Sequence, residues 1–279
     1  MPITISPIFE DQFDTMLQAF NEGYEDYIVP FHLEAPQLQG HITNGSIDLS
    51  ASRLAFDEDG RVIGIVLMGI RGQRGWVGGV GVNKAWRGKS IGRQLMQALI
   101  ASARERGLSE LQLEVIQGNT AAHNLYQSLG FEDVRRLLIL SRQPASLNTD
   151  STIAVESIDP ADALAQLEAF HIQPNPWQRE PDSLRPQLAR MVAWAVKYNN
   201  GLVALAVGFA GEKNIQWSDL GFAPDHADAL RALVLSVHIQ YPEAVGRIVN
   251  LPEDDPAWPV LSSLGYAETL AQHEMKLSL

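Results

Sequence analysis

Short apolar runs alternate along the chain with longer segments whose apolar residues recur every three or four positions. The runs are typical of buried strands, and the longer segments are typical of helices that bury one face. This alternation predicts an α/β fold with a mixed sheet. In the first half we expect strands at residues 3–8, 52–56, 62–70, 76–82, 111–116 and 134–140, and helices at 9–21, 35–44, 90–107 and 120–129.

A weaker copy of the pattern follows a polar segment, residues 143–151, which we interpret as a linker. Ser263-Leu264-Gly265-Tyr266 parallels Ser128-Leu129-Gly130-Phe131, so the second half resembles a repeat of the first. An unrelated α/β domain with the same ending by chance is the alternative. We expect two domains, 1–143 and 151–279. The second is expected to hold strands at 153–158, 202–209, 215–222 and 270–279, and helices at 161–170, 183–197 and 230–237.

The turn between the strand at 76–82 and the helix at 90–107 is the first candidate for a binding site. Gly88 and Gly92 let the backbone approach a ligand, and the first N–H groups of a helix attract anions such as phosphate. Basic residues crowd this turn, although the chain as a whole carries a net charge of −12. We expect an anionic ligand here; an ordinary connection with solvated basic side chains is the alternative. The basic residues are Lys84, Arg87, Lys89 and Arg93.

Two phosphate-binding motifs compete for this turn. Gly88-Lys89-Ser90 resembles the end of a P-loop, but that motif needs a glycine at position 83, where the chain has Asn83. The segment from Arg87 to Gly92 instead fits the pattern Arg-x-x-Gly-x-Gly, with Ser90 in place of the first glycine. Serine is small and is favoured at helix N-termini, so this departure is mild.

A second motif lies about thirty residues further along. The segment Asn119–Phe131 fits the pattern N-x-x-A-x-x-L-Y-x-x-x-G-F at every fixed position. Together the two motifs resemble the Gcn5-related N-acetyltransferase (GNAT) family closely, over roughly residues 1–142, with a weaker echo in the rest. The resemblance implies the acyl-CoA N-acyltransferase fold, here as two tandem GNAT-like domains, with acetyl-CoA as cosubstrate.

In this family the backbone amides of the first motif hold the pyrophosphate of acetyl-CoA, and the strand before it carries the pantetheine arm. The resemblance therefore implies backbone hydrogen bonds from Val80 and Val82, and a phosphate contact from the side chain of Arg87. Asn119 is implied near the arm, and it can also cap the next helix. The glycines of the strand at 76–82 predict a bulge or a close ligand contact. The expected binding residues are Val80, Val82, Arg87, Gly88, Lys89, Ser90, Ile91, Gly92 and Asn119.

Tyr126, in the second motif, is the residue expected to act as general acid. A tyrosine is ordinarily protonated at neutral pH, so it can give a proton to the departing CoA thiolate. A core tyrosine on a short amphipathic helix is the alternative. The general base is obscure, because the strand at 76–82 has no carboxylate. Glu114 is the candidate, on a strand whose leucines face the other way, and a solvated surface carboxylate is the alternative.

Other polar and aromatic residues of the first half carry weaker expectations. Tyr24, Tyr27 and His32 lie where the family builds its acceptor wall, but each is expected to serve packing. His123 occupies a variable position of the second motif, and we interpret it as a surface residue.

The second domain is expected to be a degenerate GNAT-like domain. The turn that follows its strand at 215–222 has no glycine, and Asp225 and Asp228 would repel a pyrophosphate. Leu261 stands where the first domain has Tyr126. The active site is therefore expected in the first domain.

The combined prediction is an acetyl-CoA-dependent N-acetyltransferase that moves an acetyl group to a primary amine by direct attack. No covalent intermediate and no metal are expected. A non-catalytic acyl-CoA-binding sensor or partner module is the alternative, and transfer of another acyl group is a third interpretation. The chain has no cysteine, which excludes disulfides, thiolate metal sites and a cysteine acyl-enzyme.

Charge and hydropathy narrow the partners and the compartment. The net charge of −12 and a pI near 5.0 argue against nucleic acid and anionic membranes as partners. No apolar run approaches ~18 residues and no signal pattern opens the chain, so a cytoplasmic protein is expected. The acceptor is expected to be a small-molecule or peptide amine, and the chain a monomer or homodimer.

Overall fold

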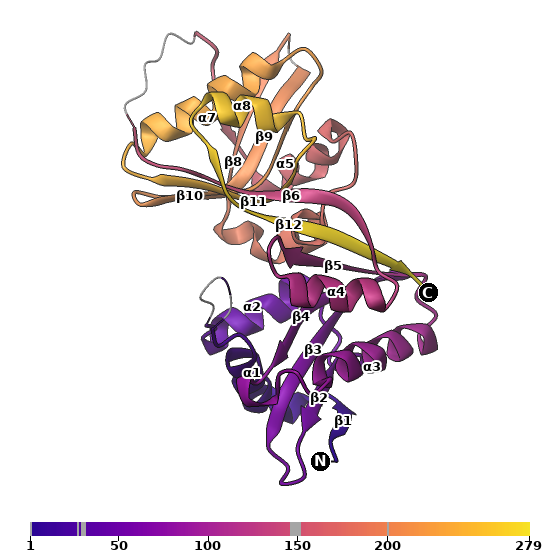
Figure 1. Cartoon of the computed structure of the whole chain (residues 1–279). Coiled ribbons are helices and arrows are strands. Elements are labelled where there is room, and N and C mark those ends of the chain that lie inside the picture. The colour runs from indigo at the N-terminus through magenta and orange to yellow at the C-terminus, as the bar shows by residue number, and fades with distance from the viewer. Residues whose placement is uncertain (1, 27, 29–31, 146–151, 200) are drawn as a thin grey trace. The chain divides into compact units, whose positions relative to one another are not determined.

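A computed structural model describes residues 2–26, 28, 32–145, 152–199 and 201–279 (Figure 1). The chain forms two compact units. Unit 1 comprises Met1–Val134 together with His273–Leu279, and unit 2 comprises Arg135–Gln272. Most of the linker expected at 143–151 lies outside the described residues.

These units differ from the linear division expected at residues 143 and 151. Strand β6 (Glu132–Arg142) begins in unit 1 and continues into unit 2, and strand β12 (Ala267–Ser278) begins in unit 2 and ends in unit 1. The last residues of the chain therefore complete the sheet of unit 1, beside β5 (Figure 1). A strand edge accepts any well-placed partner, however distant in sequence, so a boundary drawn from composition misses this exchange.

Unit 1 is built on a sheet whose strands follow the order β1-β2-β3-β4-β5-β12. Most of its elements begin and end within two residues of the predicted positions. Its strands before β6 are β1 (Thr4–Pro7), β2 (Arg53–Phe56), β3 (Val62–Arg71), β4 (Arg74–Val82) and β5 (Glu110–Ile116), and its α-helices are α1 (Phe13–Gly23), α2 (Ala35–Gly45), α3 (Ile91–Glu105) and α4 (Thr120–Ser128).

Strands β4 and β5 separate after a short stretch of parallel pairing. The pairing covers only Arg74–Trp76 of β4 and Glu110–Gln112 of β5. Beyond this point the two strands, both fully described, form no further pairs with each other, while β4 stays paired with β3 as far as Val82. The β3–β4 register shifts between Val77 and Gly79, which confirms the predicted bulge.

The glycines of β4 let helix α1 lie directly on the strand. A Cβ atom at Gly81 would come within 3.0 Å of the Cα of Gly23, at the end of α1. A Cβ atom at Gly79 would lie 3.0 Å from the ring of Phe20. Both distances are shorter than ordinary contacts, so larger residues would push α1 away from the sheet.

Helices cover both faces of the sheet in unit 1 and bury two separate apolar clusters. Met16 and Phe20 of α1 pack on one face of β3, with Leu38 of α2. Leu95 and Leu99 of α3 pack on the opposite face, and both are fully buried. Met275 and Leu277 of β12 join this second cluster, so the returning strand contributes to the core as well as to the sheet.

Unit 2 repeats the arrangement of unit 1 along its own sheet, whose order is β12-β6-β11-β10-β9-β8-β7. Strand β10 pairs with β11 in parallel only from Asn214 to Trp217, and its register with β9 shifts between Trp217 and Asp219. The elements are β7 (Glu156–Ile158), α5 (Pro160–Leu167), α6 (Pro181–Leu184), β8 (Val192–Tyr198), β9 (Gly201–Ala210), β10 (Asn214–Phe222), α7 (Ala227–Gln240), β11 (Val245–Pro252) and α8 (Ala257–Ser263).

The helix predicted at 183–197 is wrong. Residues 192–198 instead form strand β8, after the short helix α6 and a 3-10 turn at Arg185–Arg190. The sequence Val192-Ala193-Trp194-Ala195-Val196 is rich in β-branched and aromatic residues, which suit a sheet. Pairing with β9 along most of its length decides the outcome. Strand β11 was not predicted either.

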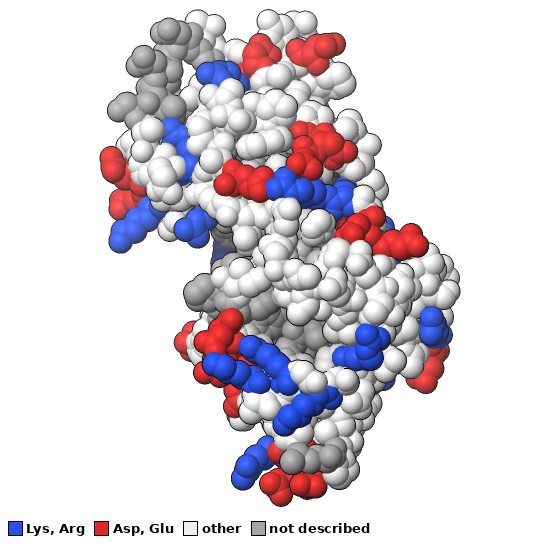
Figure 2. All heavy atoms as spheres, viewed as in Figure 1, with Lys and Arg blue, Asp and Glu red and all other residues white. Residues whose placement is uncertain are grey.

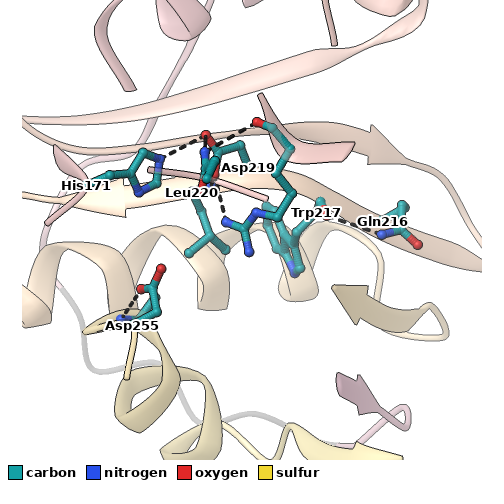
Figure 3. A network of polar contacts seen from close by, with 9 residues as sticks. His171, Gln216, Trp217, Asp219, Leu220 and Asp255 are labelled. Atoms are coloured by element: carbon teal, nitrogen blue, oxygen red, sulfur yellow. Dashed lines mark hydrogen bonds and ion pairs between the residues drawn. The ribbon is translucent and has the colours of Figure 1, made fainter. Parts of the chain in front are cut away.

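A buried ionic network stands where β10 has passed its last β11 partner (Figure 3). The carboxylate of Asp219 accepts hydrogen bonds from His171 at 2.9 Å, Arg179 at 2.7 Å and Asn175 at 3.0 Å. Burial by itself raises the pKa of Asp219, but the charge of Arg179 and the hydrogen bonds from His171 and Arg179 outweigh it and hold the pKa below its ordinary value. Side chains of unit 2 itself therefore fill the space beside β10 after its pairing with β11 has ended.

A second buried network gives the protein a stability that depends on pH. His238 hydrogen-bonds the hydroxyl of Tyr266 at 2.8 Å, and Arg142 lies 3.3 Å from its other ring nitrogen. Burial, followed by the nearby charge of Arg142, lowers the pKa of His238 from 6.5 to about 4. Between these values the unfolded chain binds a proton that the folded protein excludes, so stability falls as the pH drops from 6.5 towards 4.

We expect the urea midpoint of unfolding to decrease over this pH range, and the decrease to be smaller in His238→Gln. The variant is less stable at neutral pH as well, because Tyr266 loses a partner, so the slope against pH is the quantity to compare. Half-buried His41, whose pKa is also lowered by the loss of solvent around it, titrates with the same sign and leaves part of the slope. An identical slope in both proteins would contradict the assignment.

Candidate active site

The separation of β4 from β5 borders a cleft of about 550 Å³ in unit 1. Its walls come from the end of β4, from the turn and first residues of α3, and from α4. Tyr126 lines it, as do all the predicted binding residues except Lys89; those that do are Val80, Val82, Arg87, Gly88, Ser90, Ile91, Gly92 and Asn119.

The turn before α3 takes a shape that needs left-handed backbone. Gly88 has φ +76°, and Ser90, at the N-cap position, has φ +62°. Ser90 stands at the N-cap position, in agreement with its interpretation as an N-terminal helix residue, but its side chain makes no capping hydrogen bond. The backbone at this position takes positive φ, a conformation that glycine adopts without steric cost. Left-handed residues in a turn direct successive N–H groups to one side, as in anion-binding nests.

Helix α3 directs its N-terminus at the same cleft. The carbonyl of Ser90 accepts the N–H of Gln94 at 3.1 Å, which is the first bond of the helix. The N–H groups of Ile91, Gly92 and Arg93 therefore precede the helical hydrogen-bond ladder, and the helix dipole adds partial positive charge at this end. This end of the cleft suits a phosphate group.

The side chain of Arg87 fastens the turn to the end of α1. Its guanidinium donates to the carbonyl oxygens of Gly23 at 3.1 Å, Glu25 at 2.8 Å and Val82 at 3.1 Å. These bonds connect β4, the turn and the C-terminal end of α1, where carbonyl groups lack helical partners. The side chain therefore holds the turn against α1, and the phosphate contact expected from it stays a prediction.

The other basic side chains of the turn also have partners within the protein. Lys84 forms an ion pair with Asp26. The Nζ atom of Lys89 lies 4.5 Å from the ring centroid of Trp86, beside a neighbouring hollow. Arg93, which the sequence analysis placed only in the basic cluster, lines the cleft and donates to Ser128 at 2.7 Å. Lys and Arg side chains gather on this face of unit 1 (Figure 2).

Helix α4 contributes Asn119 and Tyr126 to the cleft. The side-chain oxygen of Asn119 accepts the N–H of Ala122 at 3.3 Å, which confirms the predicted cap. Tyr126 is 9% exposed, and its ring centroid lies 6.1 Å from that of Phe131. The tyrosine therefore packs against the core and reaches the cleft at the same time.

Comparisons with known proteins agree with this geometry. Residues 13–131 match the acetyltransferase (GNAT) family. This part of the chain therefore belongs to that family. Over 63 residues the chain is 48% identical to the mycothiol acetyltransferase of Thermobispora bispora, which is 23% of this chain and 21% of that protein. The chain thus matches only about a fifth of that curated relative's length.

Solved structures resemble the whole chain in fold. A GCN5-related N-acetyltransferase from Sphaerobacter thermophilus has a TM-score of 0.73 at 14% identity, over 99% of this chain and 95% of that one. A tandem GNAT protein from the clavulanic acid biosynthesis pathway has a TM-score of 0.70 at 12% identity, over 99% and 98%. The fold is therefore the tandem GNAT fold, in which unit 2 has the same mixed α/β architecture as the GNAT domain.

Glu114, the candidate base of the GNAT domain, does not line the cleft. It lies on β5 with its side chain on the face opposite Leu113 and Val115, as predicted, and accepts the indole N–H of Trp76 at 2.9 Å. The ring of His41, from α2, lies 5.6 Å from that of Trp76, and burial lowers the pKa of His41. These polar groups sit at the level where β4 and β5 separate.

The residues expected along the acceptor wall have different surroundings. Tyr24 stacks on Phe20 with ring centroids 4.7 Å apart, which agrees with a packing role. His32 is exposed, 4.0 Å from Glu34. Tyr27 lies outside the described residues. Among the helices that the structure describes, none has the length and apolar character needed to cross a membrane.

Replacing Gly92 by alanine separates ligand binding from folding. A Cβ atom there would lie 3.6 Å from Leu125 and 3.7 Å from Val82, which are ordinary contacts, and both neighbours line the cleft. We expect unchanged or higher thermal stability, because alanine is the better helix former. The methyl group narrows the cleft, and overpacking of about 1–3 kcal/mol corresponds to roughly 5- to 150-fold in the Kd of acetyl-CoA.

Gly40→Ala is the matched control, since Gly40 lies inside α2 and a Cβ atom there would meet nothing within 4 Å. Calorimetric titration with acetyl-CoA should give the wild-type Kd for Gly40→Ala. A wild-type Kd for Gly92→Ala would show that the ligand does not approach the first turn of α3.

Proposed function

We propose that the chain transfers an acetyl group from acetyl-CoA to a primary amine, with its active site in the cleft of unit 1. The observation that carries this proposal is the position of Tyr126, which lines the same cleft as the amide-rich N-terminus of α3 and the open edge of β4. The membership of residues 13–131 in an acetyltransferase family supports the same chemistry. In this arrangement the diphosphate, the thioester and the proton donor follow one another along the cleft.

Binding in this proposal rests on backbone groups. The N–H groups at the start of α3 hold the diphosphate, helped by the helix dipole. Where β5 departs, β4 has no strand partner among the described residues from Val77 to Val82 on the edge that faces away from β3. The pantetheine arm binds along this edge in the way that an additional strand would. A backbone N–H of β4 directed at the thioester oxygen would stabilise the tetrahedral intermediate.

The reaction then needs one base and one acid. The neutral amine attacks the thioester carbon, the C–S bond breaks as the intermediate collapses, and the thiolate leaves with a proton from Tyr126. Because a protonated amine cannot attack, a base must first take its proton. We assign this role to Glu114, directly or through water, because its carboxylate lies beside the point where the strands separate.

Unit 2 is proposed to be a degenerate GNAT-like domain without its own cofactor site. Asp225 lies in the turn before α7 and Asp228 lies in its first turn, and both would repel a diphosphate. Leu261 takes the place of the catalytic tyrosine and is fully buried in α8. The buried network around Asp219 stands beside the strand that corresponds to β4.

A non-catalytic acyl-CoA-binding module is the second candidate function. It is favoured by the position of Glu114, which is outside the residues that line the cleft. Release of free CoA from acetyl-CoA, measured with a panel of primary amines, distinguishes the two. Amine-dependent release supports the enzyme, and tight binding without release supports the module. Longer acyl-CoA donors in the same assay report the preferred acyl group.

Tyr126→Phe should lower kcat by about 10²–10⁴, because the thiolate then leaves without a positioned proton donor. The Kd of acetyl-CoA should stay close to the wild-type value, since the aromatic ring and its contact with Phe131 remain. Steady-state kinetics and calorimetric titration measure the two quantities. Tyr198→Phe is the control, as Tyr198 is 57% exposed in unit 2. A wild-type kcat in Tyr126→Phe would refute the general-acid role.

Glu114→Gln should lower kcat/KM by roughly 10²–10⁴ at neutral pH and remove the rise of kcat/KM with pH that a general base produces. Glutamine can still accept the indole N–H of Trp76, so local packing is kept. Glu110→Gln on the same strand is the control, because Glu110 forms a half-buried pair with Lys276. If kcat/KM of Glu114→Gln still rises with pH as in the wild type and is only lower at every pH, Glu114 is a positioning residue.

A further inference from the structure

Two histidines and an aspartate from three elements meet in unit 1, outside the residues that line the cleft. His123 lies on α4, Asp133 at the start of β6 and His273 on β12. The Nε2 atom of His123 is 2.9 Å and 3.1 Å from the two carboxylate oxygens of Asp133. The Nδ1 atom of His273 is 3.7 Å from the nearer of those oxygens. The imidazole rings lie 5.1 Å apart between centroids.

The spacing of these atoms fits the ligands of one metal ion. One ligand atom from each residue lies within 4.8 Å of the other two. Ligands about 2.0–2.1 Å from a tetrahedral zinc ion are ~3.3–3.4 Å from one another. The distances from Asp133 Oδ1 to the two histidine nitrogens, 2.9 Å and 3.7 Å, lie on either side of that value, and the histidine ligand atoms lie within 4.8 Å of each other.

The chemistry of the three side chains selects the kind of metal. Imidazole nitrogen suits zinc and its neighbours in the transition series, whereas magnesium and calcium prefer a shell of oxygen atoms. Two imidazoles and one carboxylate supply three zinc ligands and leave a fourth position for water. An ion can reach them, because the side chains of His123, Asp133 and His273 are 22%, 40% and 32% exposed.

We propose that His123, Asp133 and His273 bind one zinc ion. The ion fastens the returning strand β12 to helix α4 and to β6. Val134 is the last residue of unit 1 before β6 leaves it, and His273 is the first residue of β12 within it, so the site lies at both crossing points. His123 precedes Tyr126 by one turn of α4, so the same ion steadies the helix that carries the proposed general acid.

Titration of the tag-free, metal-stripped full chain with zinc chloride tests this site. We expect one equivalent to bind in calorimetry and the thermal midpoint of unfolding to rise with zinc concentration. His123→Gln and His273→Gln should each weaken binding by at least roughly 100-fold, since loss of mere supporting groups around a metal already costs 10- to 100-fold. His32→Gln should bind as the wild type does, because His32 is exposed and distant from the cluster in sequence.

Circular dichroism of the metal-free proteins establishes whether each variant folds. Cobalt substitution gives a second measurement, as imidazole and carboxylate ligands in a tetrahedral site produce visible absorption that the His123→Gln and His273→Gln variants should lack. Equal zinc binding by the wild type and His273→Gln would overturn the proposal. So would the absence of saturable binding by the wild type, which would make the cluster a hydrogen-bonded contact only. The Kd of acetyl-CoA, measured without zinc, tests the proposed function separately.

Discussion

The departure of β5 from β4 is the constraint on which the rest of unit 1 depends. Buried backbone N–H and C=O groups need partners, and β4 loses those on one side when the pairing ends at Trp76 and Gln112. Glycines in β4 let α1 approach the strand from one face, and the bulge at Gly78 turns its end. The strand edge opens onto the cleft, where a ligand with an amide-bearing arm would restore the missing pairs.

The N-terminus of α3 offers the cleft backbone N–H groups more than basic side chains. The sequence places four cations in the turn, but the folded protein gives several of them partners of their own. Arg87 bonds carbonyl oxygens, Lys84 pairs with Asp26 and Lys89 lies over Trp86. The remaining attraction for phosphate comes from N–H groups held by positive φ at Gly88 and Ser90, together with the helix dipole.

The two units share one architecture but differ in what lies beside the strands that separate. In unit 1 the strands that separate border a cleft of about 550 Å³. In unit 2 the corresponding strand carries Asp219, whose buried carboxylate is fully engaged with His171, Arg179 and Asn175. Removal of one partner from such a network would leave a buried charge without its counterpart, which is strongly destabilising. The sheet of unit 1 needs strand β12 from the far end of the chain, whereas unit 2 is one continuous segment, Arg135–Gln272.

Local sequence determined the elements of unit 1 and the glycine-containing turn before α3. Apolar spacing located α1 to α4. The two motifs, together with the resemblance that they carry, predicted that Val80, Gly92, Asn119 and Tyr126 share one site, and all four line the cleft. The error at 183–197 arose because a short apolar segment fits either period, and pairing with β9 made it the strand β8. Only the tertiary structure brought His273 to His123 and Asp133, gave Arg87 its carbonyl partners and returned β12 to unit 1. Those contacts join residues far apart in the chain, and sequence spacing carries information only about neighbours on the same helix or strand.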